Sequence, residues 1–194
     1  MISDRTYRIK DKVISVPYRT NKIILELLFL LLCCVTGVIA KKAINPVANM
    51  ITDFLHIPGG ISTAVSLMFL VIGTGLTNGR GKASMMGLIQ GVSALMIGMV
   101  GSMGVLMPLA YLVPVLAIDL VMLIPLSGDF WKRIKAFLAN ISGSVAAALF
   151  ADLAVFHLPV SVLSVYLLVA ALSGAVCGYM AGVLIDRAEK YRAR

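Results

Sequence analysis

The sequence predicts an all-α integral membrane protein with six transmembrane helices and both termini in the cytoplasm. Hydrophobic residues make up 60% of the 194 residues and charged residues only 13%, with a mean hydropathy of +0.98, whereas soluble domains carry about 25% charged residues. Six apolar runs approach the ~20 residues that a membrane-spanning helix needs. If these runs cross a membrane in alternation, every Lys and Arg except Lys41 and Lys42 lies on one side, as expected of cytoplasmic loops.

Three segments make up the first part of the chain. Residues 1–22 are basic and are predicted to lie along the inner membrane surface, with Pro17 breaking any long helix there. The first span, 23–40, runs outward. The second span, 61–77, runs inward and ends at the glycine-rich turn 78–82.

The remainder of the chain contains four more apolar runs of spanning length. They alternate in direction because the positive charges between them fall on the inner side only. These spans are residues 84–105, 109–126, 134–153 and 160–185. The prediction is a single membrane domain, residues 23–186, between the cytoplasmic segment 1–22 and a basic cytoplasmic tail, 187–194.

The outside connection 41–60 contains a segment, 46–58, that is too short to span a membrane. Its apolar residues recur at helical spacing, and its polar residues occupy the opposite face. The polar face comprises Asn49, Thr52, Asp53 and His56. The segment is predicted to be a short amphipathic helix at the outer surface, with a polar face that is either simply hydrated or turned toward a ligand.

Small residues recur every four positions on two predicted spans. The sixth span carries Ala170, Gly174, Gly178 and Gly182, and the first carries the pairs Cys33 with Gly37 and Thr36 with Ala40. Small residues let another helix approach closely in a membrane. These faces are predicted either to pack within the bundle or to dock a partner subunit.

Polar residues within the spans are candidates for function because they are costly to place in lipid. Asp119 lies near the middle of the fourth span. It is either a proton or ion relay or a structural acid bonded to Gln90, Asn140 or Ser142. At the inner edge of the first span, Glu26 is expected to pair with Lys22 four residues earlier.

A stripe of methionines, Met96, Met99, Met103 and Met107, rises toward the outer end of the third span. It is either ordinary core packing or the wall of an outward-facing pocket, since methionine adapts to varied ligands. The predicted pocket combines this wall with tyrosines and outer polar residues. Its members are Asn49, Asp53, His56, Met99, Met103, Tyr111, Asp152, His157 and Tyr166.

The sequence lacks the motifs of several classes of enzyme and nucleotide-binding protein. There is no Gly-Lys-Ser/Thr phosphate loop, and no GxSxG or HExxH motif. The three cysteines lie in apolar runs without metal-ligand spacing, so no metal site is expected. The basic residues that give the chain its net charge of +8 flank the apolar runs, where they suit anionic lipid headgroups rather than nucleic acid. The chain is expected not to be an enzyme.

The whole-chain pattern resembles the substrate-binding S component of an energy-coupling-factor (ECF) type ABC transporter. The resembling features are the chain length, the basic N-terminal segment, the small-residue segment 33–40, the connection 41–60 ending in Ile57-Pro58-Gly59-Gly60, and the glycines at 79, 81 and 87. Family members usually carry an Ala-x-x-x-Ala motif on the first helix for docking. Here the nearest equivalents are Cys33 with Gly37 and Thr36 with Ala40.

The resemblance implies a non-catalytic subunit in the plasma membrane of a prokaryote. It would capture a vitamin- or cofactor-like molecule outside, close the connection 41–60 over it, and release it inside while working with a transmembrane T component and two ATPase subunits. No cofactor of its own is implied. Metal uptake is disfavoured because the chain begins Met1-Ile2-Ser3 rather than with the Met-His motif of metal-binding members. A flat tetrapyrrole and a B vitamin are both admissible ligands.

Two other functions remain open from the sequence. The first is a stand-alone small transporter or channel that uses Asp119 as its relay. The second is a membrane-embedded enzyme that uses Asp53, His56, Asp152 and His157.

Overall fold

The chain folds as a bundle of helices, as the sequence predicts. The computed structural model describes residues 3–54, 56–58, 60–77, 81–98, 101–125 and 128–192, and within these ranges it contains no strand. The helices are α1 (Ser3–Phe54), α2 (Ile61–Thr77), α3 (Lys82–Met96), η1 (Gly101–Leu106), α4 (Met107–Met122), α5 (Asp129–Ala151), η2 (Asp152–Phe156) and α6 (Val160–Arg192).

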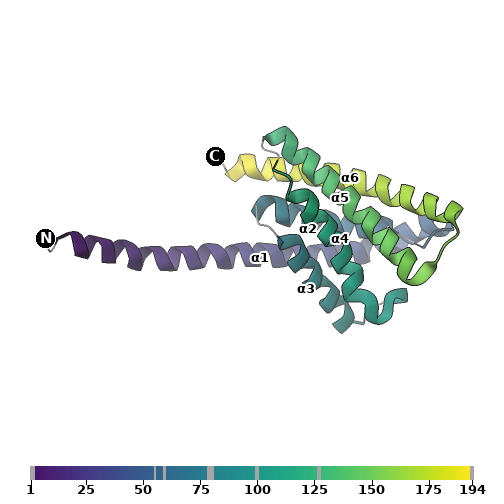
Figure 1. Ribbon diagram of the computed structural model, residues 1–194, viewed down its shortest axis with the longest axis horizontal. Helices are drawn as coiled ribbons and strands as arrows, with labels where there is room; N and C mark the ends of the chain where they lie inside the picture. The colour runs from purple at the N-terminus through teal and green to yellow at the C-terminus, as the bar shows by residue number, and fades with distance from the viewer. Residues whose placement is uncertain are drawn as a thin grey trace.

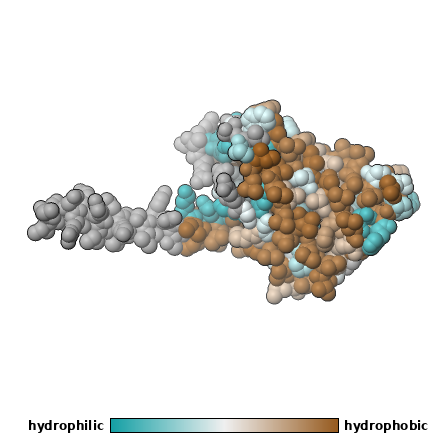
Figure 2. All heavy atoms as spheres, viewed as in Figure 1, coloured by the Kyte–Doolittle hydropathy of each residue, from teal (hydrophilic) through white to brown (hydrophobic). Residues whose placement is uncertain are grey.

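Four helical stretches of the described chain are long and apolar enough to cross a membrane. They are Lys22–Phe54, Met103–Met122, Phe130–Phe156 and Val160–Tyr191, and α2 is a shorter apolar helix. These helices are compatible with a multi-pass membrane protein. Figure 2 shows hydrophobic residues over most of the middle of the bundle and hydrophilic residues mainly at its two ends, the distribution expected when lipid surrounds the middle.

The first helix is longer than predicted. Pro17 was expected to break any helix in the N-terminal segment, and 46–58 was expected to form a separate surface helix. Instead α1 runs without interruption for 52 residues, or about 78 Å at 1.5 Å per residue, and its N-terminal part extends well beyond the other helices (Figure 1). A proline removes one hydrogen bond and strains the turn before it, but the hydrogen bonds of the flanking turns carry α1 through Pro17 and Pro46.

The third helix is shorter than predicted. The span expected over 84–105 ends as α3 at Met96 after 15 residues. Two glycines explain the early end, because Gly98 and Gly104 adopt φ angles of 73° and 52°, a left-handed conformation that interrupts a helix and that glycine adopts without strain. The chain continues through η1 into α4.

Helix α2 lies at the centre of the bundle. It packs against α1, α5 and α6, with fewer contacts to α3 and α4. Three of its side chains, Leu67, Leu70 and Val71, are fully or almost fully buried. Figure 1 shows the N-terminal part of α1 and the C-terminal end of α6 on the same side of this bundle. Following the colours from α1 to α6, successive long helices run through the bundle in alternating directions.

The small-residue face of α6 packs against α5. A Cβ added at Gly178 would lie 2.8 Å from the carbonyl oxygen of Phe137, and one at Gly174 would lie 3.0 Å from that of Asn140. Gly182 faces the backbone of Arg133 in the same way. These three glycines, predicted as candidates for docking a partner, are already covered by a helix of the same chain.

The small-residue positions of α1 divide between the interior and the surface. Cys33 is buried, and a Cβ at Gly37 would lie 3.0 Å from Nε2 of Gln90, so both face the bundle rather than a partner. Thr36 and Ala40 are only half-buried. The Thr36 hydroxyl donates to the carbonyl of Leu32, at 2.8 Å.

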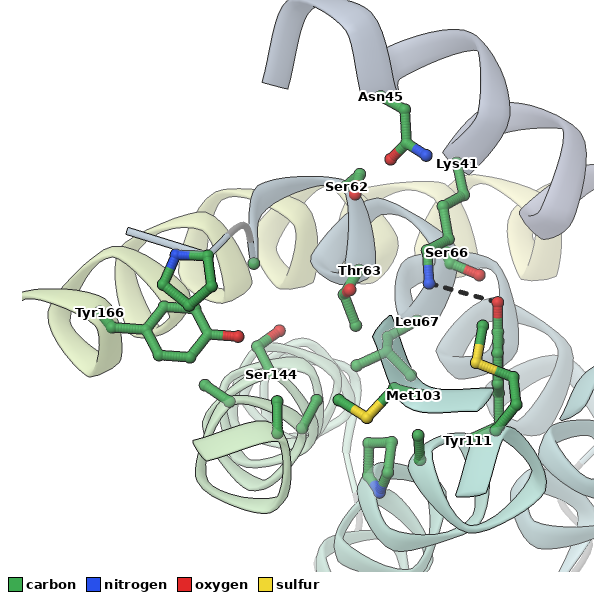
Figure 3. Close-up of a pocket in the computed structure, with 18 of the residues that line it drawn as sticks. Lys41, Asn45, Ser62, Thr63, Ser66, Leu67, Met103, Tyr111, Ser144 and Tyr166 are labelled. Atoms are coloured by element: carbon green, nitrogen blue, oxygen red, sulfur yellow. Dashed lines mark hydrogen bonds between the residues drawn. The ribbon is translucent and has the colours of Figure 1, made fainter. Parts of the chain in front are cut away.

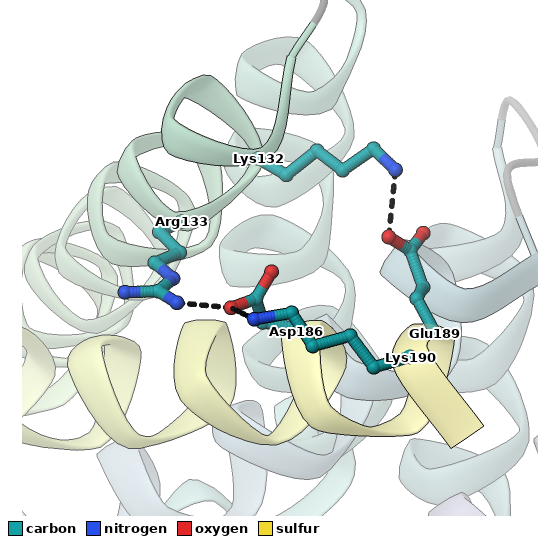
Figure 4. A network of polar contacts seen from close by, with 5 residues as sticks. All are labelled: Lys132, Arg133, Asp186, Glu189 and Lys190. Carbon is teal, nitrogen blue, oxygen red and sulfur yellow. Dashed lines mark hydrogen bonds and ion pairs between the residues drawn. The ribbon is translucent and has the colours of Figure 1, made fainter. Parts of the chain in front are cut away.

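Ion pairs gather at one end of the bundle, which the charge pattern predicts to be the inner end; the opposite end is then the outer end. Figure 4 shows two that join the start of α5 to the end of α6, Arg133 with Asp186 and Lys132 with Glu189 at 2.7 Å, and one within α6, Lys190 with Asp186 at 3.6 Å. Glu26 of α1 pairs with Lys82 of α3, at 3.2 Å, so the expected pairing with Lys22 is wrong. The charge on Glu26 links two helices instead of two turns of one helix.

Replacing Gly178 by Ala is expected to destabilise the protein, because the new methyl group meets backbone atoms of α5 that cannot move independently. The expected loss is about 1–3 kcal/mol. It is measured as a lower midpoint of thermal unfolding in detergent with a thiol-reactive fluorophore, because Cys33, Cys34 and Cys177 are all buried. Gly182→Ala is the matched control, since its nearest neighbour lies at 3.2 Å, and its loss should be smaller. Equal midpoints for wild type and Gly178→Ala would contradict this packing.

Candidate functional site

A cavity of about 420 Å³ lies at the outer end of the bundle, away from the ion pairs. Residues of α1, α2, α4, α5 and α6 line it, together with the connection between α1 and α2. Its volume is within the range of about 300–1,000 Å³ typical of small-molecule sites. The cavity is the best candidate for a binding site in the described part of the chain.

A lysine and a tyrosine from different helices meet at one side of this cavity. The ammonium group of Lys41, on α1, donates a hydrogen bond to the hydroxyl of Tyr111, on α4, at 3.2 Å (Figure 3). The same nitrogen lies 4.8 Å from the centroid of the tyrosine ring. An ammonium has three donors, so two remain for a molecule in the cavity.

Two serine hydroxyls that line the cavity have no hydrogen-bond partner among the described residues. They are Oγ of Ser66, on α2, and Oγ of Ser144, on α5. Each residue is only 2% exposed. A buried hydroxyl without a partner costs about 1–3 kcal/mol. Neither oxygen exposes appreciable surface, so a molecule in the cavity would bond to it only after the serine side chain turned toward that molecule.

Tyr166 of α6 forms the side of the cavity next to Ser144. Its side chain is 4% exposed, and its hydroxyl points toward that of Ser144 in Figure 3. Gly60 lies directly against the tyrosine ring, because a Cβ there would be 3.1 Å from Cε2, and its φ of 117° also favours glycine. Close by, Ile57 packs in an apolar cluster with Tyr166 and Ala148. The connection between α1 and α2 is thus seated on the cavity wall.

The remaining wall is mostly apolar. Leu67, Met103, Met107, Pro114 and Phe156 contribute to it. Such a surface suits the body of an organic molecule, while the few polar groups set its orientation.

The structure brings part of the predicted pocket together. Asn49, Met103, Tyr111 and Tyr166 all line the cavity. Met99 lies outside the described residues.

Four predicted pocket residues do not line the cavity. Asp53 is exposed at the end of α1, and His56 is exposed in the following turn with a φ of 56°. The carboxylate of Asp152 accepts a hydrogen bond from the backbone N–H of Leu158 at 2.7 Å, which holds the turn between α5 and α6. The His157 ring lies 3.3 Å from the carbonyl of Val155. These four side chains lie in or beside the turns at the outer end, and they do not gather around the cavity.

Sequence reasoning found Asn49 but missed most of the other polar residues that line the cavity. Lys41, Asn45 and Asn49 recur every fourth residue along α1 and form one polar stripe on its cavity side. The available signal was Lys41 itself, which departs from the inner-side distribution of basic residues. Ser62, Thr63 and Ser66 at the start of α2, and Ser144, were also overlooked.

Asp119 caps a neighbouring helix. Its carboxylate accepts hydrogen bonds from the backbone N–H of Ala83 at 3.3 Å and from the N–H and hydroxyl of Ser84, the former at 2.8 Å. These groups form the first turn of α3, where backbone N–H groups lack helical partners and attract negative charge. Asp119 therefore lies level with the inner start of α3, not near the middle of the bundle as predicted.

The other two intramembrane polar residues also join helices, but not through Asp119. The side-chain amide of Gln90 donates to the carbonyl of Cys34 at 2.8 Å. That of Asn140 donates to the carbonyls of Gly174 at 3.0 Å and Ala64 at 3.3 Å. Ser142 donates within its own helix, to Ala139. The predicted bonds from Asp119 to Gln90, Asn140 or Ser142 are therefore wrong.

The cavity offers one ammonium group, several hydroxyls and amides, and an apolar wall. This set is suited to binding and orienting a small organic molecule. Within the described ranges, no three His, Cys, Asp or Glu side chains are grouped as a metal ion would require. Comparison of the chain with known protein families, with curated proteins and with solved structures found no match.

Replacing Asp119 by Ala is expected to lower the free energy of unfolding by about 1–3 kcal/mol, because the first turn of α3 loses its acceptor. Asp119→Asn should lose less than Asp119→Ala, since its amide oxygen can still accept from Ser84 while its NH2 group cannot accept from the N–H of Ala83. The measurement is the thermal midpoint in detergent, with the exposed Asp53→Ala as control. A relay role would instead leave the thermal midpoint of Asp119→Asn unchanged and abolish transport.

Replacing Ser66 or Ser144 by Ala is expected to leave the thermal midpoint of the ligand-free protein unchanged or slightly raised, because each substitution removes a buried hydroxyl that has no partner. Ser84→Ala should lower the midpoint, since its hydroxyl bonds to Asp119. A clear loss of stability in Ser66→Ala or Ser144→Ala would mean that these hydroxyls are already satisfied within the protein.

Proposed function

We propose that this protein is the substrate-capturing membrane subunit of an uptake system, and that it binds a small vitamin- or cofactor-like molecule at its outer face. The observation that carries the proposal is the cavity at the outer end of the bundle, which is lined by the ammonium group of Lys41 and by two serines whose buried hydroxyls have no partner among the described residues. A wall drawn from five helices can hold such a molecule in one orientation.

The proposed arrangement has six crossings, with both termini in the cytoplasm of a prokaryotic cell. Its support is the clustering of basic residues and ion pairs at the end opposite the cavity, since positive charge is retained on the inner side. Helix α2, with 17 residues, is at the short end of the spanning range of about 17–25 residues. The shorter α3 would reach the outer surface together with η1.

The energy for uptake would come from partner subunits. The sequence has no nucleotide-binding loop of its own and resembles an S component of an ECF transporter, which works with a T component and two ATPases. Of the candidate docking positions, Thr36 and Ala40 are the two that are half-buried rather than buried. The volume of the cavity favours a ligand of the size of a B vitamin over a tetrapyrrole.

The two alternatives have less support. A stand-alone transporter with Asp119 as its relay would need that carboxylate to be free, but it accepts three hydrogen bonds from the start of α3. A membrane enzyme would need Asp53, His56, Asp152 and His157 to gather around a substrate, and none of them lines the cavity.

The proposal predicts that the tagged full-length chain, purified gently from membranes of its own host, brings down a second membrane subunit and a pair of ATPases. In liposomes, the chain alone should bind its ligand without accumulating it, and accumulation should require the co-purified subunits and ATP. The control is the same complex with a non-hydrolysable ATP analogue. Accumulation by the chain alone, driven by an ion gradient, would support a stand-alone transporter instead.

A further inference from the structure

We infer that the outer cavity takes a small, water-soluble organic monocarboxylate, whose carboxylate group binds the ammonium of Lys41. The inference rests on the proposed function in that it takes this cavity to be the ligand site. It adds the charge and the chemical class of the ligand.

The first step is the charge of the cavity. Lys41 is the one charged side chain among the described residues that line it, and no Asp or Glu is present to balance the ammonium group. The ammonium group contacts the hydroxyl and the ring of Tyr111. A charge held in a partly buried site is costly unless it is paired. A bound anion would supply the missing partner.

The second step is the position of the lysine. Lys41 and Lys42 are neighbours in sequence and are the two basic residues at the outer end of the predicted topology. Lys42 is exposed and does not line the cavity, whereas Lys41 is half-buried and turns into it (Figure 3). Of the two neighbouring lysines on α1, Lys41 therefore places its ammonium group in the cavity and Lys42 does not.

The third step is the number of charges on the ligand. One ammonium balances one negative charge, as on a carboxylate. A phosphate ester carries about 1.5 to 2 negative charges at neutral pH, and part of that charge would remain unpaired in a largely apolar cavity. A cationic ligand would meet Lys41 without any carboxylate to offset the repulsion. A monocarboxylate fits this balance best.

The fourth step concerns the body of the ligand. The unpartnered hydroxyls of Ser66 and Ser144 and the amide of Asn45 can donate and accept hydrogen bonds. An acyl chain would leave them unsatisfied. A carboxylate can come from a membrane fatty acid as well as from a dissolved metabolite, but these polar groups favour a water-soluble acid that carries further hydrogen-bonding atoms.

The test uses the purified full-length protein in detergent and measures binding by isothermal titration calorimetry. The probes are matched pairs that differ in charge: nicotinate and nicotinamide, pantothenate and pantothenol, biotin and biotin amide. Thiamine serves as the cationic probe and octanoate as the lipid-like acid. At least one water-soluble acid is expected to bind, and its neutral counterpart should bind at least about tenfold more weakly.

Replacing Lys41 by Met should weaken binding of that acid by roughly thirtyfold or more, as expected when one partner of a buried charge pair is removed. Lys41→Arg should retain most of the affinity, because it keeps the positive charge. That result would show that a substitution at this position leaves the site folded. Lys42→Met is the matched control and should bind as wild type does. The thermal midpoint of each variant without ligand separates loss of binding from loss of folding.

Four results would overturn the inference: no binding by any of the acids, equal binding of an acid and its neutral counterpart, an unchanged affinity in Lys41→Met, or stronger binding of octanoate than of every water-soluble acid. These results leave the proposed function separately testable. ATP-dependent uptake of a neutral or cationic molecule would refute the monocarboxylate alone. Binding of an acid by a chain that never associates with ATPases would refute the uptake system alone.

Discussion

In a bundle of apolar helices, a buried polar side chain needs a hydrogen-bond partner within the protein, and the helices of this chain are arranged around that constraint. Asp119 of α4 satisfies the first turn of α3, Gln90 of α3 binds the backbone of α1, and Asn140 of α5 binds the backbones of α2 and α6. Each bond needs two helices at close range, which the glycines between α5 and α6 allow. The polar groups thus fix which helices are neighbours.

The two ends of the molecule differ in how far their polar side chains are paired. At the inner end, acidic and basic side chains pair across helices, so Lys82, Lys132 and Arg133 each have a carboxylate partner. At the outer end, Lys41 has only a tyrosine, and the hydroxyls of Ser66 and Ser144 have no partner within the described chain. The other two buried side-chain atoms without a partner in the described chain, Oε1 of Gln90 and Oδ1 of Asn140, belong to residues away from the cavity. The cavity thus combines two unpartnered hydroxyls with an ammonium group that has no carboxylate partner, a set of polar groups that could orient a ligand.

The sequence predicted the helical class and the alternation of the helices, because hydrophobic runs and the placement of basic residues depend on lipid rather than on tertiary contacts. It could not predict the continuity of α1, since a proline ends or merely strains a helix according to how well the flanking turns are held. Nor could it predict the role of Asp119, whose partner is the backbone of another helix. Lys41 could have been assigned to the site from its exceptional position, but the unpartnered state of Ser66 depends on neighbours from several helices.

The continuity of α1 also changes how a ligand would be enclosed. A flexible connection over 41–60 would have to become ordered around each ligand, and that ordering reduces affinity. In the structure, Lys41, Asn45 and Asn49 stand on one helix, so this side of the cavity is formed before anything binds. The break between α1 and α2 is confined to 55–60, where Gly60 rests on the ring of Tyr166. The polar stripe of α1 and Gly60, seated on Tyr166, therefore form two sides of the cavity that need not become ordered when a ligand binds.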